Sequence, residues 1–154
     1  MGSLQGERMS GLVWNVLQAA NRLTEVGNRL AAPFGLTAAR WQVMGVIMMQ
    51  EASIADIARA LSQSRQGVQR LADDLVRDGM AVYRPNPRHA RAKLLVPTPG
   101  GTASYQGLMQ EQGKWMEDLA RDLPVEDIGV ARAVLAQLVS TLDAGRSSST
   151  ADED

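Results

Sequence analysis

The apolar positions of this chain recur at helical spacing through most of its length. From Ser10 to about Pro33 they alternate by three and four residues, which predicts a helix that packs along a narrow seam. The pattern that begins after the N-cap residue Thr37 is apolar around most of its circumference and predicts a central core helix. Residues 1–7 show no pattern and carry no expectation. The seam positions of the first helix are Val13, Val16, Ala20, Leu23, Gly27 and Leu30.

Two short amphipathic patterns follow, separated by only two residues. The first begins at Ser53, whose hydroxyl can cap it, with Asp56 three residues later as in a capping box. The second begins after Ser64 and ends at Gly79. A connection this short makes the helices cross steeply, which predicts a helix-turn-helix. The apolar stripes are Ile54, Ile57, Ala58 and Leu61 in the first helix, and Val68, Leu71, Ala72, Leu75 and Val76 in the second.

After Gly79 the helical period ends and two short strands are predicted, at residues 81–83 and 94–96. The segment between them, residues 84–93, contains two prolines and an Asn-Pro step, so we expect a hairpin with a long tip. A hairpin beside a helix-turn-helix is a wing. Its basic or potentially basic side chains are Arg84, Arg88, His89, Arg91 and Lys93.

Beyond the wing, Thr98 as a cap and Pro99 at the first helical position predict a long helix, which Pro124 interrupts. The final helix is expected to end at Gly145, before a disordered acidic tail over residues 146–154. The terminal helices carry more apolar seam than a small winged helix can cover, which favours a homodimer; packing of these helices within one chain is the alternative. The seam of the final helix is Ile128, Ala131, Leu135, Leu138 and Leu142.

The polar face of the second short helix carries groups that hydrogen-bond base edges and phosphates. Between Ser53 and Pro97 eight basic side chains stand against four acidic ones, a net charge of +4 in a chain whose total is −1. Such a basic module favours double-stranded DNA as a partner. The alternative for the polar helix face is a solvated helix on another kind of small domain. The alternative for the basic hairpin is a loop whose charges serve only solubility. The predicted DNA contacts are Ser64, Arg65, Gln66, Gln69, Arg70, Arg84, Arg88, His89, Arg91 and Lys93.

Composition argues against several other classes of protein. The absence of cysteine excludes disulfides, thiolate metal sites and thiol-based redox sensing. The single histidine, His89, lies among arginines, so we expect no bound metal. No serine has a plausible histidine and acid partner, so we expect no enzymatic activity and no cofactor. No apolar run approaches the ~20 residues of a membrane span, and no export leader is recognisable, so we expect a cytoplasmic protein.

These segments, in this order, resemble the MarR family of bacterial transcriptional regulators. The matching segments are "LTAARWQVM" from Leu36, "IADIARAL" from Ile54, "SRQGVQRLADDLVRDG" from Ser64 and "RPNPRHARAKLLVPTPGG" from Arg84. Many members carry an Asp beside the wing arginine, whereas this wing tip has no acid. The resemblance implies a mainly α fold with a small β-hairpin wing: one domain over residues 1–145, with a winged helix-turn-helix over 36–97 and dimerisation helices over 9–32 and 98–144.

The resemblance also implies a homodimer that places two recognition helices on successive major grooves, roughly 34 Å apart, of a pseudo-palindromic operator. Relatives of this kind often bind small aromatic or phenolic acids in a cleft beside the dimer helices. Candidate effector contacts are Trp14, Arg22, Trp41 and Met44. The alternatives are a core position for Trp41 and Met44, a dimer contact for Trp14 and a solvated position for Arg22.

The leading functional hypothesis is a dimeric, sequence-specific DNA-binding regulator that represses by occluding a promoter and that a small effector releases. In this hypothesis Arg88 and Arg91 of the wing enter the flanking minor groove. The alternative is a winged helix that binds a protein and has no specific DNA binding. The basic, glutamine-rich helix face favours the first hypothesis, since a protein-binding module would not need it.

Overall fold

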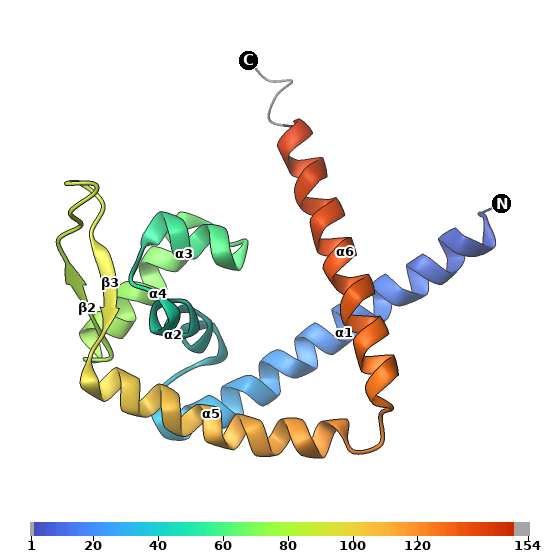
Figure 1. The fold of residues 1–154 in the computed structure, drawn as a ribbon, viewed down its shortest axis with the longest axis horizontal. Coiled ribbons are helices and arrows are strands. Elements are labelled where there is room, and N and C mark those ends of the chain that lie inside the picture. The colour runs from blue at the N-terminus through green and yellow to red at the C-terminus, as the bar shows by residue number, and fades with distance from the viewer. Residues whose placement is uncertain (1, 150–154) are drawn as a thin grey trace. The chain divides into compact units, whose positions relative to one another are not determined.

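The computed structural model describes residues 2–149 of the chain, and Figure 1 shows its helices and its small antiparallel sheet. The described residues divide into two compact units that meet within one long helix, the first ending at Gln112 and the second beginning at Gly113. The single domain over residues 1–145 stays a prediction. The elements in chain order are α1 (Leu4–Ala31), the 3-10 turn η1 (Ala32–Phe34), α2 (Ala38–Met49), β1 (Ala52–Ser53), α3 (Ile54–Leu61), α4 (Arg65–Arg77), β2 (Ala81–Arg84), β3 (Leu94–Pro97), α5 (Pro99–Ala120) and α6 (Val125–Ser149).

Helix α2 lies at the centre of the first unit, as its apolar circumference predicted. Thr37 caps it by accepting a hydrogen bond from the backbone N–H of Arg40 at 3.2 Å. The helix contacts α1, α3, α4 and β3. Burial of apolar side chains from all these elements around one helix is the main source of stability of this unit. The fully buried large side chains are Val43, Met44, Ile57, Val68, Leu75, Leu95 and Leu108.

The helix-turn-helix is confirmed. The hydroxyl of Ser53 accepts from the N–H of Asp56 at 3.2 Å and lies 2.7 Å from the Asp56 carboxylate, to which it donates. Ser62 turns the chain between α3 and α4 in the left-handed conformation, with φ of +52°. Helix α4 ends at Arg77, and Gly79 adopts a positive φ of +74°, which a glycine adopts without steric cost.

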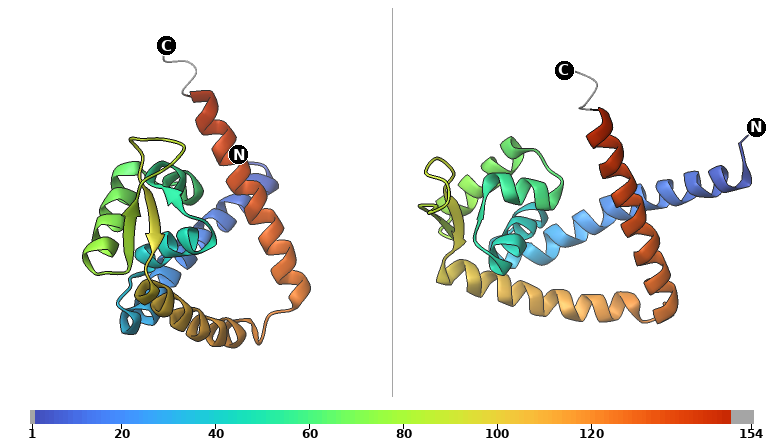
Figure 2. Two further views of the ribbon diagram at one scale, coloured as in Figure 1. Left: turned by 60° about the vertical axis from the view of Figure 1, so that its left-hand side comes forward. Right: turned by 45° about the horizontal axis from the view of Figure 1, so that its top comes forward.

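The wing contains one strand more than the sequence predicted. The sheet has the order β1-β3-β2, and all its pairs are antiparallel, with Ala52 opposite Leu95 and Val82 opposite Val96. Strand β1 spans two residues, too few to show an alternating pattern. Because Ser53 both ends β1 and caps α3, this strand joins the wing directly to the helix-turn-helix. Figure 2 shows the hairpin alongside α4.

Two helix ends differ from the prediction. Helix α1 begins at Leu4 rather than near Ser10, because Ser3 caps it by accepting from the N–H of Gly6 at 3.1 Å. Helix α6 continues to Ser149, beyond the predicted end at Gly145, since a glycine can be accommodated within a helix at a modest cost. Residues 150–154 of the predicted tail lie outside the described residues.

Helix α6 presents apolar side chains to solvent along its length, among them Ile128, Leu135 and Leu142. By length and composition alone the segment Val125–Gly145, with a mean hydropathy of 1.2, is apolar enough to cross a membrane. It is the one such segment within residues 2–149. An exposed apolar helix of this kind also fits an interface with another protein chain.

Candidate nucleic-acid interface

The N-terminal half of α4 presents its polar side chains to solvent. Ser64 caps the helix by accepting from the N–H of Gly67 at 3.1 Å. A Cβ at Gly67 would lie 3.0 Å from that same hydroxyl oxygen, so a glycine at this position leaves room for the Ser64 side chain that caps the helix. Its place in the helix therefore has a local explanation. The exposed polar side chains here are the predicted Arg65, Gln66, Gln69 and Arg70.

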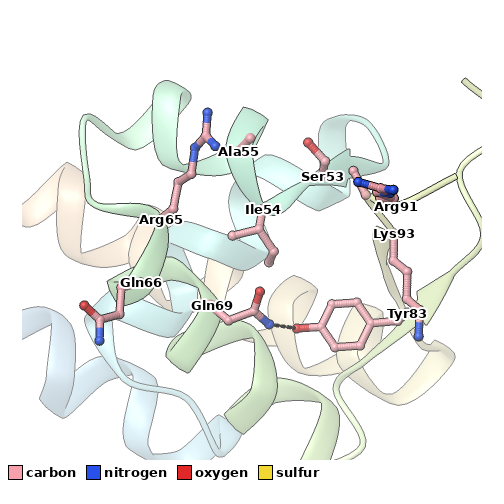
Figure 3. A pocket seen from close by; sticks show the side chains of 10 residues that line it. Ser53, Ile54, Ala55, Arg65, Gln66, Gln69, Tyr83, Arg91 and Lys93 are labelled. Atoms are coloured by element: carbon pink, nitrogen blue, oxygen red, sulfur yellow. Dashed lines mark hydrogen bonds between the residues drawn. The ribbon is translucent and has the colours of Figure 1, made fainter. Parts of the chain in front are cut away.

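A hollow of about 570 Å³ joins this helix face to the wing; we call it the recognition hollow. Figure 3 shows side chains of α4 on one side of it and the wing on the other. It brings together five of the predicted DNA contacts, which are Arg65, Gln66, Gln69, Arg91 and Lys93. The predicted contacts Ser64, Arg70, Arg84, Arg88 and His89 do not line it. Its remaining lining consists of Ser53, Ile54, Ala55, Tyr83 and Ala92.

Gln69 belongs to a three-membered hydrogen-bond network that the sequence analysis did not predict. Its amide nitrogen Nε2 lies 2.9 Å from Oδ1 of Asp73 and 2.8 Å from the hydroxyl of Tyr83. That hydroxyl donates to Oδ1 of Asp73 at 2.7 Å. The i, i+4 spacing of Gln69 and Asp73 on one helix is the signal that could have identified half of this network. The contribution of Tyr83 depends on the packing of β2 against α4.

Burial and the Asp73 carboxylate together favour the protonated form of the Tyr83 hydroxyl. Partial burial of the phenol, and then its hydrogen bond to the Asp73 carboxylate, raise the pKa of Tyr83 to about 12. The hydroxyl is therefore a hydrogen-bond donor throughout the physiological pH range.

A second cluster of charges, at the C-terminal end of α4, fastens that helix to α2. The guanidinium of Arg40 lies 3.3 Å from Asp74 and 2.8 Å from Asp78, and Arg77 lies 2.6 Å from Asp74. Hydrogen bonds from Arg77 first and then Arg40 lower the pKa of Asp74. Asp74 of α4 and Asp78, which caps the C-terminal end of that helix, are thus paired with arginines at the end away from the recognition hollow. This role of Arg40 was not predicted from the sequence.

The wing tip is held by backbone turns. Asn86 accepts from the N–H of Arg88 through its side chain at 3.0 Å and from the N–H of His89 through its carbonyl at 3.2 Å. His89 in turn accepts from the N–H of Ala92 at 3.2 Å. Within residues 2–149 no acid lies within ion-pair distance of the five wing cations, all of which are exposed. Arg88 lines a separate hollow of about 500 Å³, together with Glu51.

The four effector candidates do not come together. A hollow of about 470 Å³ lies between α1 and α2, and Trp41 lines it beside Gly27. Met44 is fully buried in the core, in agreement with its alternative interpretation. Trp14 is 63% exposed, and Arg22 donates to Oε1 of Gln18 at 2.6 Å; neither lines this hollow. In the described part of the chain no group of three or more His, Cys, Asp or Glu residues could hold a metal ion.

Comparison with known proteins agrees with this architecture. A family model described as the MarR family matches residues 34–92. An uncharacterised protein of Mycobacterium tuberculosis is 34% identical over 140 residues, which cover 91% of this chain and 98% of that protein. The transcriptional activatory protein BadR of Rhodopseudomonas palustris is 28% identical, with 96% of this chain and 89% of BadR covered.

Solved structures share the fold at low sequence identity. A mutant MarR from E. coli complexed with operator DNA has a TM-score of 0.77 at 22% identity, covering 89% of this chain and 99% of that one. The MarR family transcription regulator SP03579 has a TM-score of 0.79 at 18% identity, covering 97% of both chains. The order of the elements, the winged helix and these similarities together show that the chain belongs to the MarR family of transcriptional regulators.

Proposed function

We propose that the protein is a dimeric, sequence-specific DNA-binding regulator of transcription. The observation that carries this proposal is the recognition hollow, in which Arg65, Gln66 and Gln69 of α4 stand opposite Arg91 and Lys93 of the wing. Positive and amide side chains on two adjacent protrusions suit a duplex, since one protrusion can contact base edges while the other contacts phosphates. The E. coli relative with the same fold is described as complexed with operator DNA, which supports this assignment.

The two protrusions have different roles in this proposal. The N-terminal half of α4 enters the major groove, where Arg65, Gln66, Gln69 and Arg70 contact base edges. In the same proposal Arg88 and Arg91 of the wing enter the flanking minor groove, where the negative potential attracts guanidinium groups. The wing cations are free of internal ion pairs within the described residues, so no internal pairing has to be broken when they bind phosphate.

Dimerisation through the terminal helices supplies the second copy of α4. Apolar side chains such as Val13 and Leu17 of α1 and Leu135 and Leu142 of α6 are 38% to 61% exposed in the single chain. Their burial in a dimer would be favourable. Two copies of α4 on successive major grooves, roughly 34 Å apart, then require a pseudo-palindromic operator.

A DNA titration tests the proposal and its alternative. Fluorescence anisotropy of a labelled random duplex at two salt concentrations should show binding that weakens steeply with salt, because bound phosphates release counterions. Absent or salt-insensitive binding would instead support a protein-interaction module.

On a selected operator, Arg70→Ala should cost about 1–3 kcal/mol of binding free energy at one base position. Arg91→Ala should weaken binding to all sequences and reduce the salt slope.

The last part of the proposal concerns regulation. In the cytoplasm the protein represses transcription by occluding a promoter, and a small aromatic or phenolic acid relieves this repression. The hollow between α1 and α2, which Trp41 lines, supports an effector site in this proposal. A reporter placed behind the selected operator should be repressed by the protein. Activation would reverse the sign of regulation, and BadR is a relative described as activatory.

A further inference from the structure

The hydrogen-bond network around Gln69 restricts how this side chain can read a base. The Asp73 carboxylate can only accept hydrogen bonds, so the edge of the Gln69 amide that faces it must be the NH₂ group. The Tyr83 hydroxyl donates its own proton to Asp73, so its oxygen is left to accept from the same Gln69 nitrogen. Both partners therefore require the same orientation of the amide.

This orientation leaves the amide oxygen as the outward group. Gln69 lines the recognition hollow, and Figure 3 shows its Oε1 directed away from Tyr83. Turning the amide by half a rotation would place Oε1 against the Asp73 carboxylate and forfeit that hydrogen bond, and the Tyr83 hydroxyl could then donate to Oε1 only by giving up its own bond to Asp73. The oxygen therefore already faces the recognition hollow in the DNA-free protein.

We infer that Asp73 and Tyr83 are positioning residues that make Gln69 a hydrogen-bond acceptor toward DNA. Its contact is the exocyclic amino group of an adenine or a cytosine, N6 or N4, which are the donors that the major groove offers. A freely rotating glutamine would accept equally well as donate, and could contact the guanine or thymine carbonyl at the same place. The inference rests on the proposed function, since it requires α4 to enter the major groove.

The first experiment locates the base pair. In vitro selection from a random duplex library, with the full-length protein and with Gln69→Ala, should yield the same operator except at one position per half-site, where Gln69→Ala loses its preference. No enriched sequence at all would overturn the proposed function and, with it, the inference. An enriched operator that Gln69→Ala reads unchanged would overturn the inference alone.

The second experiment removes the amino group at that position. The adenine is replaced by purine, or the cytosine by pyrimidin-2-one, and the affinity ratio between intact and modified duplex is measured. The ratio should be about threefold to tenfold for the wild-type protein, the worth of one net hydrogen bond, and close to one for Gln69→Ala. A ratio of one for the wild-type protein would overturn the inference.

The third experiment tests the two positioning residues. Asp73→Ala should reduce the ratio toward one, and Tyr83→Phe should reduce it partly, because the carboxylate still holds the amide. Asp73→Ala also removes a negative charge and should tighten binding to every sequence, so Glu51→Ala, which removes an exposed charge outside the network, is the matched control. Glu51→Ala should tighten binding and leave the ratio unchanged. An unchanged ratio in Asp73→Ala would overturn the positioning role.

Discussion

At the scale of single residues, close backbone packing makes one glycine indispensable while its neighbour is free to change. Gly101 is in the first turn of α5, and a Cβ there would lie 1.9 Å from the carbonyl oxygen of Met80. That oxygen also accepts from the N–H of Thr98 at 3.0 Å, so it cannot move without losing a hydrogen bond. The turn that ends α4 is therefore pressed directly onto the start of α5.

We expect Gly101→Ala to destabilise the protein by about 3 kcal/mol or more, because backbone must move to relieve the overlap. Gly100→Ala is the matched control, since its Cβ would meet nothing closer than the Thr98 hydroxyl at 3.8 Å. Its effect should lie between none and about 1 kcal/mol of stabilisation. Urea unfolding followed by circular dichroism measures both variants. Equal stability of the two would contradict the packing described.

Tyr83 should titrate well above an ordinary tyrosine. Its pKa of about 12 exceeds the ordinary tyrosine value of 10.0, so the stability it contributes is fully present below pH 10 and is lost as the pH rises through 12. The ultraviolet absorbance of phenolate, compared between wild-type protein and Tyr83→Phe, isolates this residue from Tyr105, the other tyrosine of the chain. A difference titration centred near pH 10 would show that neither the burial of the phenol nor its hydrogen bond to Asp73 persists in solution.

At the scale of the elements, the position of α4 depends on contacts at both of its ends. The N-terminal end is capped by Ser64, and the C-terminal end is joined to α2 through the ion pairs of Arg40 with the carboxylates of Asp74 and Asp78. The side chain of Arg40 is only 18% exposed, so its ion pairs are screened less than those of a fully solvated pair. Arg40 thus sets the orientation in which α4 presents its polar face.

Arg40→Ala should lower the urea midpoint more than Arg59→Ala does, because the pair of Arg59 with Asp56 is 74% and 53% exposed. Since the pKa of Asp74 is lowered from 3.8, the contribution of the Arg40 cluster is present above that pH and is lost as the pH falls below it. The gap between wild-type protein and Arg40→Ala should therefore narrow in acid. A gap that is independent of pH would remove the ion pairs as its cause.

At the scale of the whole molecule, charge and apolar surface are segregated along the chain. The net charge of +4 between Ser53 and Pro97 occupies the winged helix, while exposed apolar side chains concentrate on α1 and α6. A single chain would leave this apolar surface in water. The proposed dimer resolves this cost and, at the same time, doubles the basic surface available to a duplex.

Leu135→Glu should shift the protein from dimer to monomer in sedimentation equilibrium and weaken operator binding by at least tenfold, because one half-site supplies only half of the contacts. Ala133→Glu adds the same charge to the exposed helix on the face opposite the seam and should leave both properties unchanged. If Leu135→Glu remains dimeric, the α6 seam is not the interface.

Most of the winged helix could be predicted from the sequence because its signals are local. The caps Thr37, Ser53 and Ser64, and the apolar stripes between them, depend on residues three or four positions apart, and the structure confirms them. The helix start at Leu4 and the continuation of α6 past Gly145 were missed. Weak end signals decide such boundaries, since a serine cap or an internal glycine changes the free energy by only about 1 kcal/mol.

The amino-acid pattern alone was sufficient for the helix-turn-helix, the hairpin, and the concentration of arginine and glutamine on one helix face, because periodicity and charge are read along the chain. It could not reveal strand β1, the Arg40 cluster, or the network that orients Gln69. Arg40 is 38 residues from Asp78, and Tyr83 is 14 residues from Gln69, so these contacts exist only after α2, α4 and β2 have packed. Tertiary packing thus turns Gln69 from a side chain able to donate or accept into one with a defined orientation.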